Sequence, residues 1–286
     1  MAPAAPVCPC CLPYPPVPLT FASASLLPLS ASPSVFSPAD TRRRRPRWAR
    51  AGIALTLFFT LVVAFLNYYN ISKLLTAEDK HYIRLYLPDL AEGCATKMTY
   101  AAQIQLIRHV QMVVGARTKG WQGLPEGAPR EPRQLYTERT GMCYDRSRTL
   151  EKIYLYLGFE TRHLSLFARE ANVHSYTTVL LHHVPSHAIS EVRTKHGWLM
   201  VDSNDLWIAL APDGEPVSMH KMQQTLLAEQ PLKWLIPTPD SDDNFYNNRC
   251  IPIYGLYSRH GRFYPPYTSG IPDFRLRGLL YNFDSE

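Results

Sequence analysis

The sequence predicts a mixed α+β domain behind an N-terminal membrane anchor. Apolar residues recur with helical spacing at 99–114 and 142–157. Segments rich in β-branched and aromatic residues follow, at 161–167, 173–184 and 191–201. Helices that precede a group of strands are typical of α+β domains, in which helices pack on an antiparallel sheet. An uncharged apolar run at 51–66 comes before all of these segments and predicts the anchor.

The apolar run, AGIALTLFFTLVVAFL, is flanked by arginines and aromatic residues. A helix that spans a bilayer needs about 20 apolar residues, so we assign the span to 49–69. Trp48 before the run and Tyr68 and Tyr69 after it occupy positions typical of interfacial aromatics. The arginines indicate that the N-terminus is cytoplasmic and that 70–286 is periplasmic or extracellular. A cleaved signal peptide or a buried core helix is the alternative, but no clear Ala-x-Ala site follows the run, which favours an uncleaved anchor in the lipid bilayer.

The positive charge of the chain is confined to one short region. The whole chain has a net charge of +6. Residues 1–50 contain six arginines and a single acid, Asp40, whereas the rest of the chain carries 24 basic and 23 acidic side chains. A domain that binds nucleic acid needs a basic stripe across its folded surface. We therefore expect no nucleic acid among the partners.

Residues 1–48, rich in proline and arginine, are expected to be disordered. Ten prolines and many alanines and serines fall within 1–40, and such a composition buries too little apolar surface to fold. A start codon assigned too early would also account for this segment. The thiols of Cys8, Cys10 and Cys11 do not have the spacing of usual zinc ligands, so we expect no metal there.

Beyond the anchor the sequence divides into three parts. We expect a linker at 70–98, a catalytic domain at 99–235 and an aromatic-rich C-terminal extension at 236–286. Gly158 is expected to end the helix that begins near residue 142. The aromatic residues of the extension either form the core of a segment that wraps the domain or line a sugar or peptide cleft.

Cys143 is expected in the first turn of the helix at 142–157, on the same inward face as Leu150. The N-terminus of a helix carries a positive partial charge, which stabilises the nucleophilic thiolate. Gly141 allows close approach of the backbone, so that N–H groups beside the sulfur could stabilise an oxyanion. Taken alone, such a residue is more often a buried core cysteine.

His174 and Asp202 are expected to face each other across a hairpin. If 173–184 pairs antiparallel with 191–201, the two residues lie equally far from a turn centred near Ala188. Opposed residues point to the same face of a sheet. A carboxylate beside an imidazole fixes its tautomer and stabilises the imidazolium. The hairpin would therefore pair a general base with the group that orients it, although His174 alone is more often a satisfied strand histidine.

Three segments together resemble the transglutaminase-like superfamily of papain-like cysteine enzymes, of the membrane-anchored bacterial type. They are GMCYDRSRTLEKIYLYLGFETRH, NVHSYTTVLL and HGWLMVDSN, and the resemblance covers about 100–210. It implies that Cys143 is the nucleophile, His174 the general base and acid, and Asp202 the orienting residue. It also implies a papain-like α+β fold, in which the cysteine helix packs on the antiparallel sheet that bears the histidine and the aspartate, and no cofactor.

The activity implied by the resemblance is thiol-dependent acyl transfer, or amide hydrolysis as an amidase or protease. The substrate would be a peptide, a protein or an envelope-linked amide outside the cytoplasmic membrane, and the acyl group would pass from Cys143 to water or to an amine. Many members of the superfamily carry an acid shortly after the histidine, and its absence from 175–178 leaves the substrate class open. Gln134 and Trp121 are candidates for a side chain that stabilises the oxyanion. The alternative function is a non-catalytic binding or scaffold module of a cell-envelope assembly.

Two further cysteines and a group of histidines complete the candidates. In an oxidising compartment Cys94 and Cys250 either form a bridge or remain two buried, reduced thiols, and the sequence leaves both alternatives open. Four histidines lie close in sequence: His182, His183, His187 and His196. Adjacent residues of a strand point to opposite faces, so at most a subset could converge, and we expect no metal site.

Overall fold

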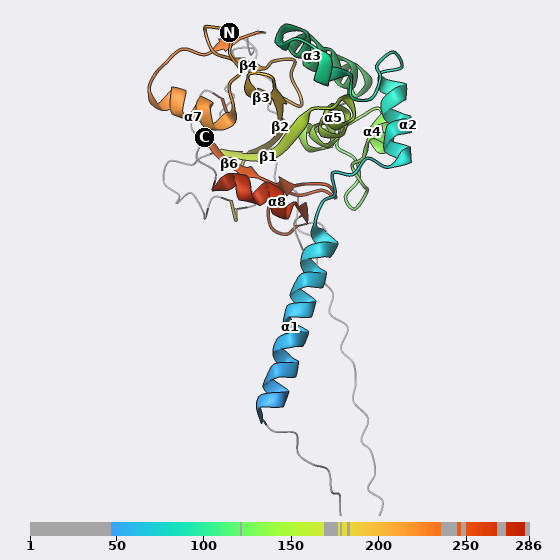
Figure 1. The fold of residues 1–286 in the computed structure, drawn as a ribbon, viewed down its shortest axis with the longest axis vertical. Helices are drawn as coiled ribbons and strands as arrows, with labels where there is room; N and C mark the ends of the chain where they lie inside the picture. The colour runs from blue at the N-terminus through green and yellow to red at the C-terminus, as the bar shows by residue number, and fades with distance from the viewer. Residues whose placement is uncertain are drawn as a thin grey trace, which may run out of the picture. The chain divides into compact units, whose positions relative to one another are not determined.

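The computed structural model describes residues 47–120, 122–168, 177, 179–181, 184–235, 245–246, 250–267 and 273–283. The described part is a mixed α+β structure with antiparallel sheets, and one long apolar helix lies near its N-terminus (Figure 1).

Helix α1 spans Arg47–Tyr69, and its residues up to 68 belong to a unit separate from the domain of residues 69–286. Its segment Ala51–Tyr69 is long and apolar enough to cross a membrane. None of its most apolar window is buried, so α1 is not a core helix in this structure. A signal sequence can have the same length and apolar composition, so these two properties do not distinguish it from a membrane anchor.

The domain contains six α-helices in its described part, together with two 3₁₀ helices and eight strands. The helices are α2 (Ala77–Tyr86), η2 (Cys94–Lys97), α3 (Tyr100–Arg117), α4 (Pro132–Glu138), α5 (Cys143–Leu157), α7 (Met219–Leu227), α8 (Leu276–Leu279) and η4 (Leu280–Asn282). The strands are β1 (Glu160–Ala168), β2 (Ser186–Thr194), β3 (Gly197–Val201), β4 (Ala209–Leu210), β5 (Lys233–Trp234), β6 (Cys250–Tyr254), β7 (Leu256–Tyr257) and β8 (Asp273–Phe274).

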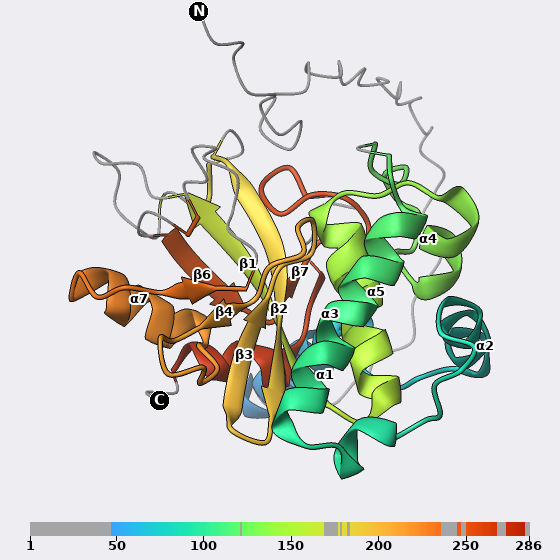
Figure 2. The same cartoon turned by 90° about the horizontal axis from the view of Figure 1, so that it is seen from above.

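The main sheet has the strand order β3-β2-β1-β6, and all of its neighbouring strands are antiparallel. Helices α3 and α5 lie on one side of it and α7 on the other (Figure 2). Alternate side chains of each strand point to opposite faces of the sheet. In β2, Val192 packs with the α3 and α5 side chains, whereas Ile189 packs with Met219 and Met222 of α7. The sheet therefore separates two apolar cores.

Helix α5 is the central helix of the domain. Its apolar face, with Leu150 and Ile153, is fully buried, and Gly158 ends it in the left-handed conformation with φ of 96°. The charged side chains on its remaining faces are buried as well, including Arg148, Glu151 and Lys152. Such groups need partners inside the protein, because an unpaired buried charge is strongly destabilising.

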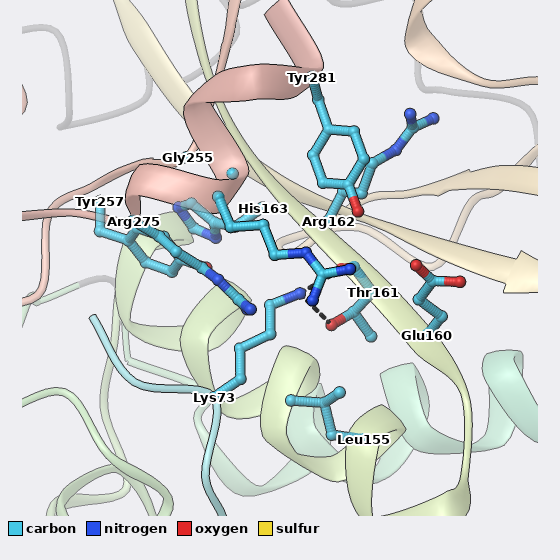
Figure 3. Close-up of a pocket in the computed structure, with 12 residues that line it drawn as sticks. Lys73, Leu155, Glu160, Thr161, Arg162, His163, Gly255, Tyr257, Arg275 and Tyr281 are labelled. Atoms are coloured by element: carbon cyan, nitrogen blue, oxygen red, sulfur yellow. Dashed lines mark hydrogen bonds between the residues drawn. The ribbon is translucent and has the colours of Figure 1, made fainter. Parts of the chain in front are cut away.

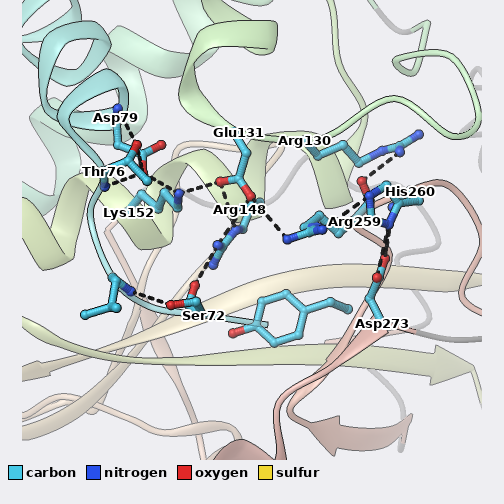
Figure 4. Close-up of polar contacts among 12 residues, drawn as sticks. Ser72, Thr76, Asp79, Arg130, Glu131, Arg148, Lys152, Arg259, His260 and Asp273 are labelled. Carbon is cyan, nitrogen blue, oxygen red and sulfur yellow. Dashed lines mark hydrogen bonds and ion pairs between the residues drawn. The ribbon is translucent and has the colours of Figure 1, made fainter. Parts of the chain in front are cut away.

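The partners of these charges come largely from outside α5 (Figure 4). Lys152 Nζ lies 2.6 Å from Asp79 Oδ2 in α2 and 2.6 Å from Glu131 Oε2 before α4. Arg148 Nη1 lies 2.8 Å from Glu151 Oε2, and Lys73 Nζ lies 3.3 Å from Glu151 Oε1. A continuous chain of ion pairs thus joins 73–79 to the middle of α5.

The structure confirms the helices expected at 99–114 and 142–157 as α3 and α5, and the strand expected at 161–167 as β1. The segment 70–98, expected as a linker, contains α2 and η2 and contributes the buried Ile83 to the core.

The expected hairpin is wrong. Residues 186–194 form β2, and the turn lies at Lys195 and His196, where Thr194 pairs with Gly197. Gly197 has φ of 132°, a conformation that favours glycine, so Lys-His-Gly supplies the turn that the sequence analysis placed at Ala188. Ala188 instead pairs with Ser165 inside the sheet. The residues described between 173 and 184 are not in a strand.

Of the two alternatives for Cys94 and Cys250, the bridge between them is not formed in this structure. Cys94 packs against the core on the α3 and α5 side of the sheet, whereas Cys250 belongs to the core on the α7 side. The sheet stands between the two cores, which accounts for the missing bridge.

Candidate functional site

Cys143 is the first residue of α5 and is fully buried. Gly141 just before it is required by packing, because a Cβ at that position would lie 2.5 Å from Leu135 Cδ1 and 3.2 Å from Asp145 Cβ. The sequence analysis expected both the first-turn position of Cys143 and a close backbone approach at Gly141. The apolar side chains around the thiol come from β1, β2 and the C-terminal part of the chain, and they include Phe167, Ala188 and Phe263.

Asp145 fixes the start of α5. Its Oδ2 accepts hydrogen bonds from the backbone N–H of Met142 at 2.8 Å and of Leu124 at 3.2 Å. Its Oδ1 forms an ion pair of 2.5 Å with Arg130 Nε, and neither side chain has any exposed surface. A carboxylate in the first turn also interacts favourably with the helix dipole. The turn that carries Cys143 is therefore held in place by a buried ionic contact.

Helix α5 is docked on β2 by a pair of serines. Ser147 Oγ lies 3.1 Å from Ser190 Oγ. Cys143 is one helical turn before Ser147, about 6 Å back along the axis, and Ala188 is two residues before Ser190, about 6.6 Å back along the strand. Cys143 and Ala188 accordingly belong to the same apolar cluster. The thiol thus lies beside the beginning of β2, where His187 precedes Ala188.

His187 and Asp202 form a buried pair at this end of the sheet. His187 Nε2 lies 2.7 Å from Asp202 Oδ2, with the two side chains 10% and 1% exposed. Tyr246 donates to the same oxygen at 2.5 Å, and the backbone N–H groups of Asn204 and Asp205 donate to Oδ1 at 2.6 and 2.7 Å. Four donors therefore surround one carboxylate.

The charge state of Asp202 follows from these contacts. Burial acts to raise its pKa, but His187, the Asp205 N–H and Tyr246 outweigh burial and bring the pKa below its ordinary value. Asp202 is accordingly ionised at neutral pH and accepts a hydrogen bond from Nε2–H of His187. The neutral imidazole of His187 then carries its hydrogen on Nε2 and its basic lone pair on Nδ1.

Three elements converge on the loop that follows Asp202. Gln111 of α3 donates to the backbone oxygens of Asp202 at 3.0 Å and of Trp207 at 3.1 Å. Arg146 of α5 donates to Asn204 Oδ1 at 2.8 Å. Ser203 in the loop donates to the backbone oxygen of Ala188 in β2 at 2.5 Å. These bonds bring the first turn of α5, the start of β2 and the end of β3 together.

The residues expected from the sequence have different outcomes. Cys143 and Asp202 both lie at this convergence, whereas His174 and Trp121 lie outside the described residues. Gln134 is in α4, with a buried Oε1 that has no hydrogen-bond partner in the described structure. The imidazole that contacts Asp202 is that of His187, which the sequence analysis considered only as a metal ligand.

A signal for His187 was present in the sequence. A turn at Lys-His-Gly sets the register in which Ser190 pairs with Val201. Continuing this register places Ile189 opposite Asp202, with His187 two residues further along on the same face. The glycine at 197 is the residue that would have identified the turn.

The histidines do not gather into a metal site in the described part of the chain. His187 contacts Asp202, and His196 contacts Glu215 at 3.0 Å. His182 and His183, like Cys8, Cys10 and Cys11, lie outside the described residues. Among the residues that the structure places, no group of three or more potential metal ligands is found.

The chain was compared with protein-family models, curated proteins and solved structures, and none of them matches it.

Proposed function

We propose that this protein is a membrane-anchored thiol-dependent acyltransferase or amidase that acts through Cys143, His187 and Asp202. The observation that carries the proposal is the buried hydrogen bond of 2.7 Å between His187 Nε2 and Asp202 Oδ2, since Ala188, the residue after His187, shares an apolar cluster with Cys143. Carboxylate, imidazole and thiol in this order form the base and nucleophile of cysteine acyl-transfer enzymes. The same arrangement, a cysteine helix on an antiparallel sheet, supports the resemblance to papain-like transglutaminases.

The reaction starts with the transfer of the Cys143 proton to His187 Nδ1. The thiolate attacks the carbonyl carbon of an amide, and the imidazolium then protonates the leaving amine as the carbon–nitrogen bond breaks. Water or a second amine attacks the resulting thioester, with His187 again accepting the proton. Asp202 stabilises the imidazolium in both halves of the reaction.

The oxyanion of the tetrahedral intermediate requires hydrogen-bond donors. Backbone N–H groups in the first turn of a helix have no intrahelical acceptor and point along the axis beyond the N-terminus. We assign this role to the N–H of Cys143 itself, beside the sulfur, since that of Met142 is bonded to Asp145. No cofactor takes part in this scheme.

The substrate is an amide in a peptide, a protein or envelope-linked material outside the cytoplasmic membrane. Helix α1 supports membrane anchoring by its length and composition, and the arginines before it support a cytoplasmic N-terminus. The lipid bilayer is the corresponding partner.

A second candidate is a non-catalytic binding or scaffold module of the cell envelope. The burial of Cys143 favours it, because the thiol has no exposed surface in this structure and lies beneath apolar side chains. A buried structural cysteine is inert. The two candidates differ in one measurable property, which is the formation of a thioester at Cys143.

The test uses the full chain in detergent with two readouts. The first is the release of amines from a library of peptide amides, and the second is the incorporation of a biotin-labelled primary amine. Cys143→Ala should abolish both, and His187→Ala should lower both by about 10³-fold or more, because the base and acid are lost. His174→Ala is the matched control and should retain activity.

Mass spectrometry of the wild-type reaction should find the acyl group on the peptide that contains Cys143. Activity of Cys143→Ala equal to that of the wild type would refute the mechanism. Loss of activity in His174→Ala with retention in His187→Ala would show that the general base is His174, as the sequence analysis expected. Absence of any acyl-enzyme across the library, in protein with a normal unfolding transition, would favour the scaffold.

A further inference from the structure

A second polar cavity lies away from Cys143, His187 and Asp202 (Figure 3). Its volume is about 150 Å³, and its walls come from the first residues of β1, the segment 255–257, the C-terminal segment 275–281 and Lys73. An engineered cavity of about this volume accepts a benzene-sized ligand. The cavity therefore has room for one small functional group with a few attached atoms.

The lining of this cavity has an excess of positive charge. The basic lining residues are Lys73, Arg162, Arg275 and Arg277, and the one acid is Glu160. Arg162 is neutralised by Glu191 at 2.8 Å, and Glu160 contacts Arg193 at 3.1 Å. Lys73 is 3.3 Å from Glu151.

Arg275, which is half-buried, and the exposed Arg277 differ from these basic residues. Neither forms an ion pair with any carboxylate in the part of the chain that the structure describes. Two guanidinium groups without an ion-pair partner among the described residues thus flank the cavity. An anion bound there would supply the missing negative charge.

Two buried nitrogen atoms at this cavity also have no hydrogen-bond partner in the described structure. They are His163 Nε2 and Arg275 Nη1. His163 is only 3% exposed, its Nδ1 lies 3.1 Å from Ser147 Oγ, and its ring stacks on Tyr257 with centroids 4.0 Å apart. Buried polar atoms are nearly always bonded, and these two nitrogens belong to residues that line the cavity.

The tautomer of His163 suits a donor role. Ser147 Oγ lies 3.1 Å from both His163 Nδ1 and Ser190 Oγ, and Ser190 Oγ also donates to the backbone oxygen of Ser147 at 3.4 Å, so we assign the Ser147 hydroxyl as the donor to Nδ1. With Nδ1 accepting, the hydrogen of the neutral ring is on Nε2. Both unpartnered nitrogens are then donors, and both require an acceptor such as an anionic oxygen.

We infer that this cavity binds a phosphate monoester through Arg275, Arg277 and His163. A phosphate monoester carries about −1.5 to −2 charges at pH 7 and three acceptor oxygens, which match two uncompensated guanidinium groups and the Nε2 donor. Arginine also binds phosphate oxygens in bidentate fashion. A single carboxylate would leave one positive charge uncompensated.

Two sources supply such a group, a soluble phosphate ester and the headgroup of a phosphatidic-acid-type lipid. Lys73 follows the last residue of the apolar helix α1 by four positions. Leu276 and Leu280 flank Arg277 in sequence and are 42% and 63% exposed. Exposed apolar residues beside basic ones are typical of surfaces that contact lipid.

The test is binding to the full chain in neutral detergent. Inorganic phosphate and glycerol phosphate are titrated calorimetrically, with sodium chloride at the same ionic strength as the reference. Binding should weaken by at least about tenfold in Arg275→Gln and in Arg277→Gln. Arg133→Gln is the matched control, because Arg133 is an exposed arginine of α4 that neither lines the cavity nor contacts a residue that lines it, and this variant should bind as the wild type does.

A second arm uses nanodiscs of phosphatidylcholine with or without phosphatidic acid, and native mass spectrometry counts the retained lipids. Retention of phosphatidic acid that is lost in Arg275→Gln identifies the lipid source, whereas Arg275-dependent binding of the soluble esters alone identifies the soluble source. Either result supports the site. Binding in neither arm, or binding that Arg275→Gln and Arg277→Gln leave unchanged, would overturn it. None of these readouts depends on the chemistry at Cys143.

Discussion

Asp202 illustrates how a single buried carboxylate sets the chemistry around it. Both of its oxygens are bonded, one to two backbone N–H groups and the other to His187 and Tyr246. Because its pKa is lowered in the folded protein, the stability that these bonds contribute is present above the ordinary carboxyl pKa and is lost as pH falls through the lowered value. Asp202 therefore remains ionised throughout the neutral range.

The first prediction concerns the residues that position His187. Asp202→Asn should lower kcat by about 10²-fold or more, because the wrong tautomer of His187 is then favoured, but by less than Cys143→Ala. Tyr246→Phe removes one donor to Asp202 and should lower kcat by roughly tenfold with little change in KM. Tyr100→Phe, which removes a hydroxyl bonded to the Gly214 backbone, is the control. Equal activity of Tyr246→Phe and wild type would show that Tyr246 does not position Asp202.

The second prediction concerns His163 and pH. Burial lowers the pKa of His163 to about 4, against about 6.5 in the unfolded chain. Between these values the unfolded chain binds more protons, so the free energy of unfolding should fall as pH decreases from about 6.5 to about 4, by up to about 3 kcal/mol. Denaturant unfolding in phosphate-free buffer should show a smaller loss in His163→Asn, whereas the exposed His196→Gln should behave as the wild type. An unchanged pH dependence in His163→Asn would contradict the assignment.

At the scale of elements, the helices were more predictable than the sheet. Apolar spacing and Gly158 identified α5 to within a residue of its bounds, because helix periodicity and caps are local properties. The β2–β3 hairpin was not identified, since its register depends on which of two breaks, Pro185 or Gly197, forms the turn. The wrong turn paired Asp202 with His174, which lies outside the described residues, whereas Asp202 contacts His187 in the structure.

The third prediction concerns the start of α5. Asp145→Ala removes the acceptor for two backbone N–H groups and leaves the fully buried Arg130 without its carboxylate. Loss of one member of a buried pair typically costs about 3 to 5 kcal/mol, which urea unfolding would measure. Glu126→Gln breaks the more exposed pair with Arg262 and should cost less than about 1 kcal/mol. Equal losses in the two variants would mean that the buried pair has no special role in stability.

At the scale of the whole molecule, contacts between segments far apart in the sequence join the start of the domain to its C-terminal part and to α5. Ile71 donates its N–H to the oxygen of Phe274 at 2.7 Å, which joins the start of the domain to its C-terminal part. Burial acts to raise the pKa of Glu151 on α5, but Lys73 and Arg148 lower it to about 2. These long-range contacts could not be predicted from the sequence, because no local pattern links residue 71 to 274 or 73 to 151.

The fourth prediction follows from these contacts and concerns where the folded domain begins. A chain of residues 70–286 keeps Lys73 and Asp79 and should unfold cooperatively, with a midpoint near that of the domain in the full chain. A chain of residues 81–286 leaves Lys152 without Asp79 and Glu151 without Lys73, and it also lacks half of α2. Uncompensated buried charges of this kind cost several kcal/mol, which is comparable to the whole stability of a domain, so we expect this chain to be unfolded or aggregated.

Within 70–286, Lys80→Ala is the control, since Lys80 forms only a partly exposed pair with Glu92 and its loss should cost less than about 1 kcal/mol. Circular dichroism and size-exclusion chromatography would follow both chains, and a well-folded 81–286 would show that the segment 70–80 is a linker after all.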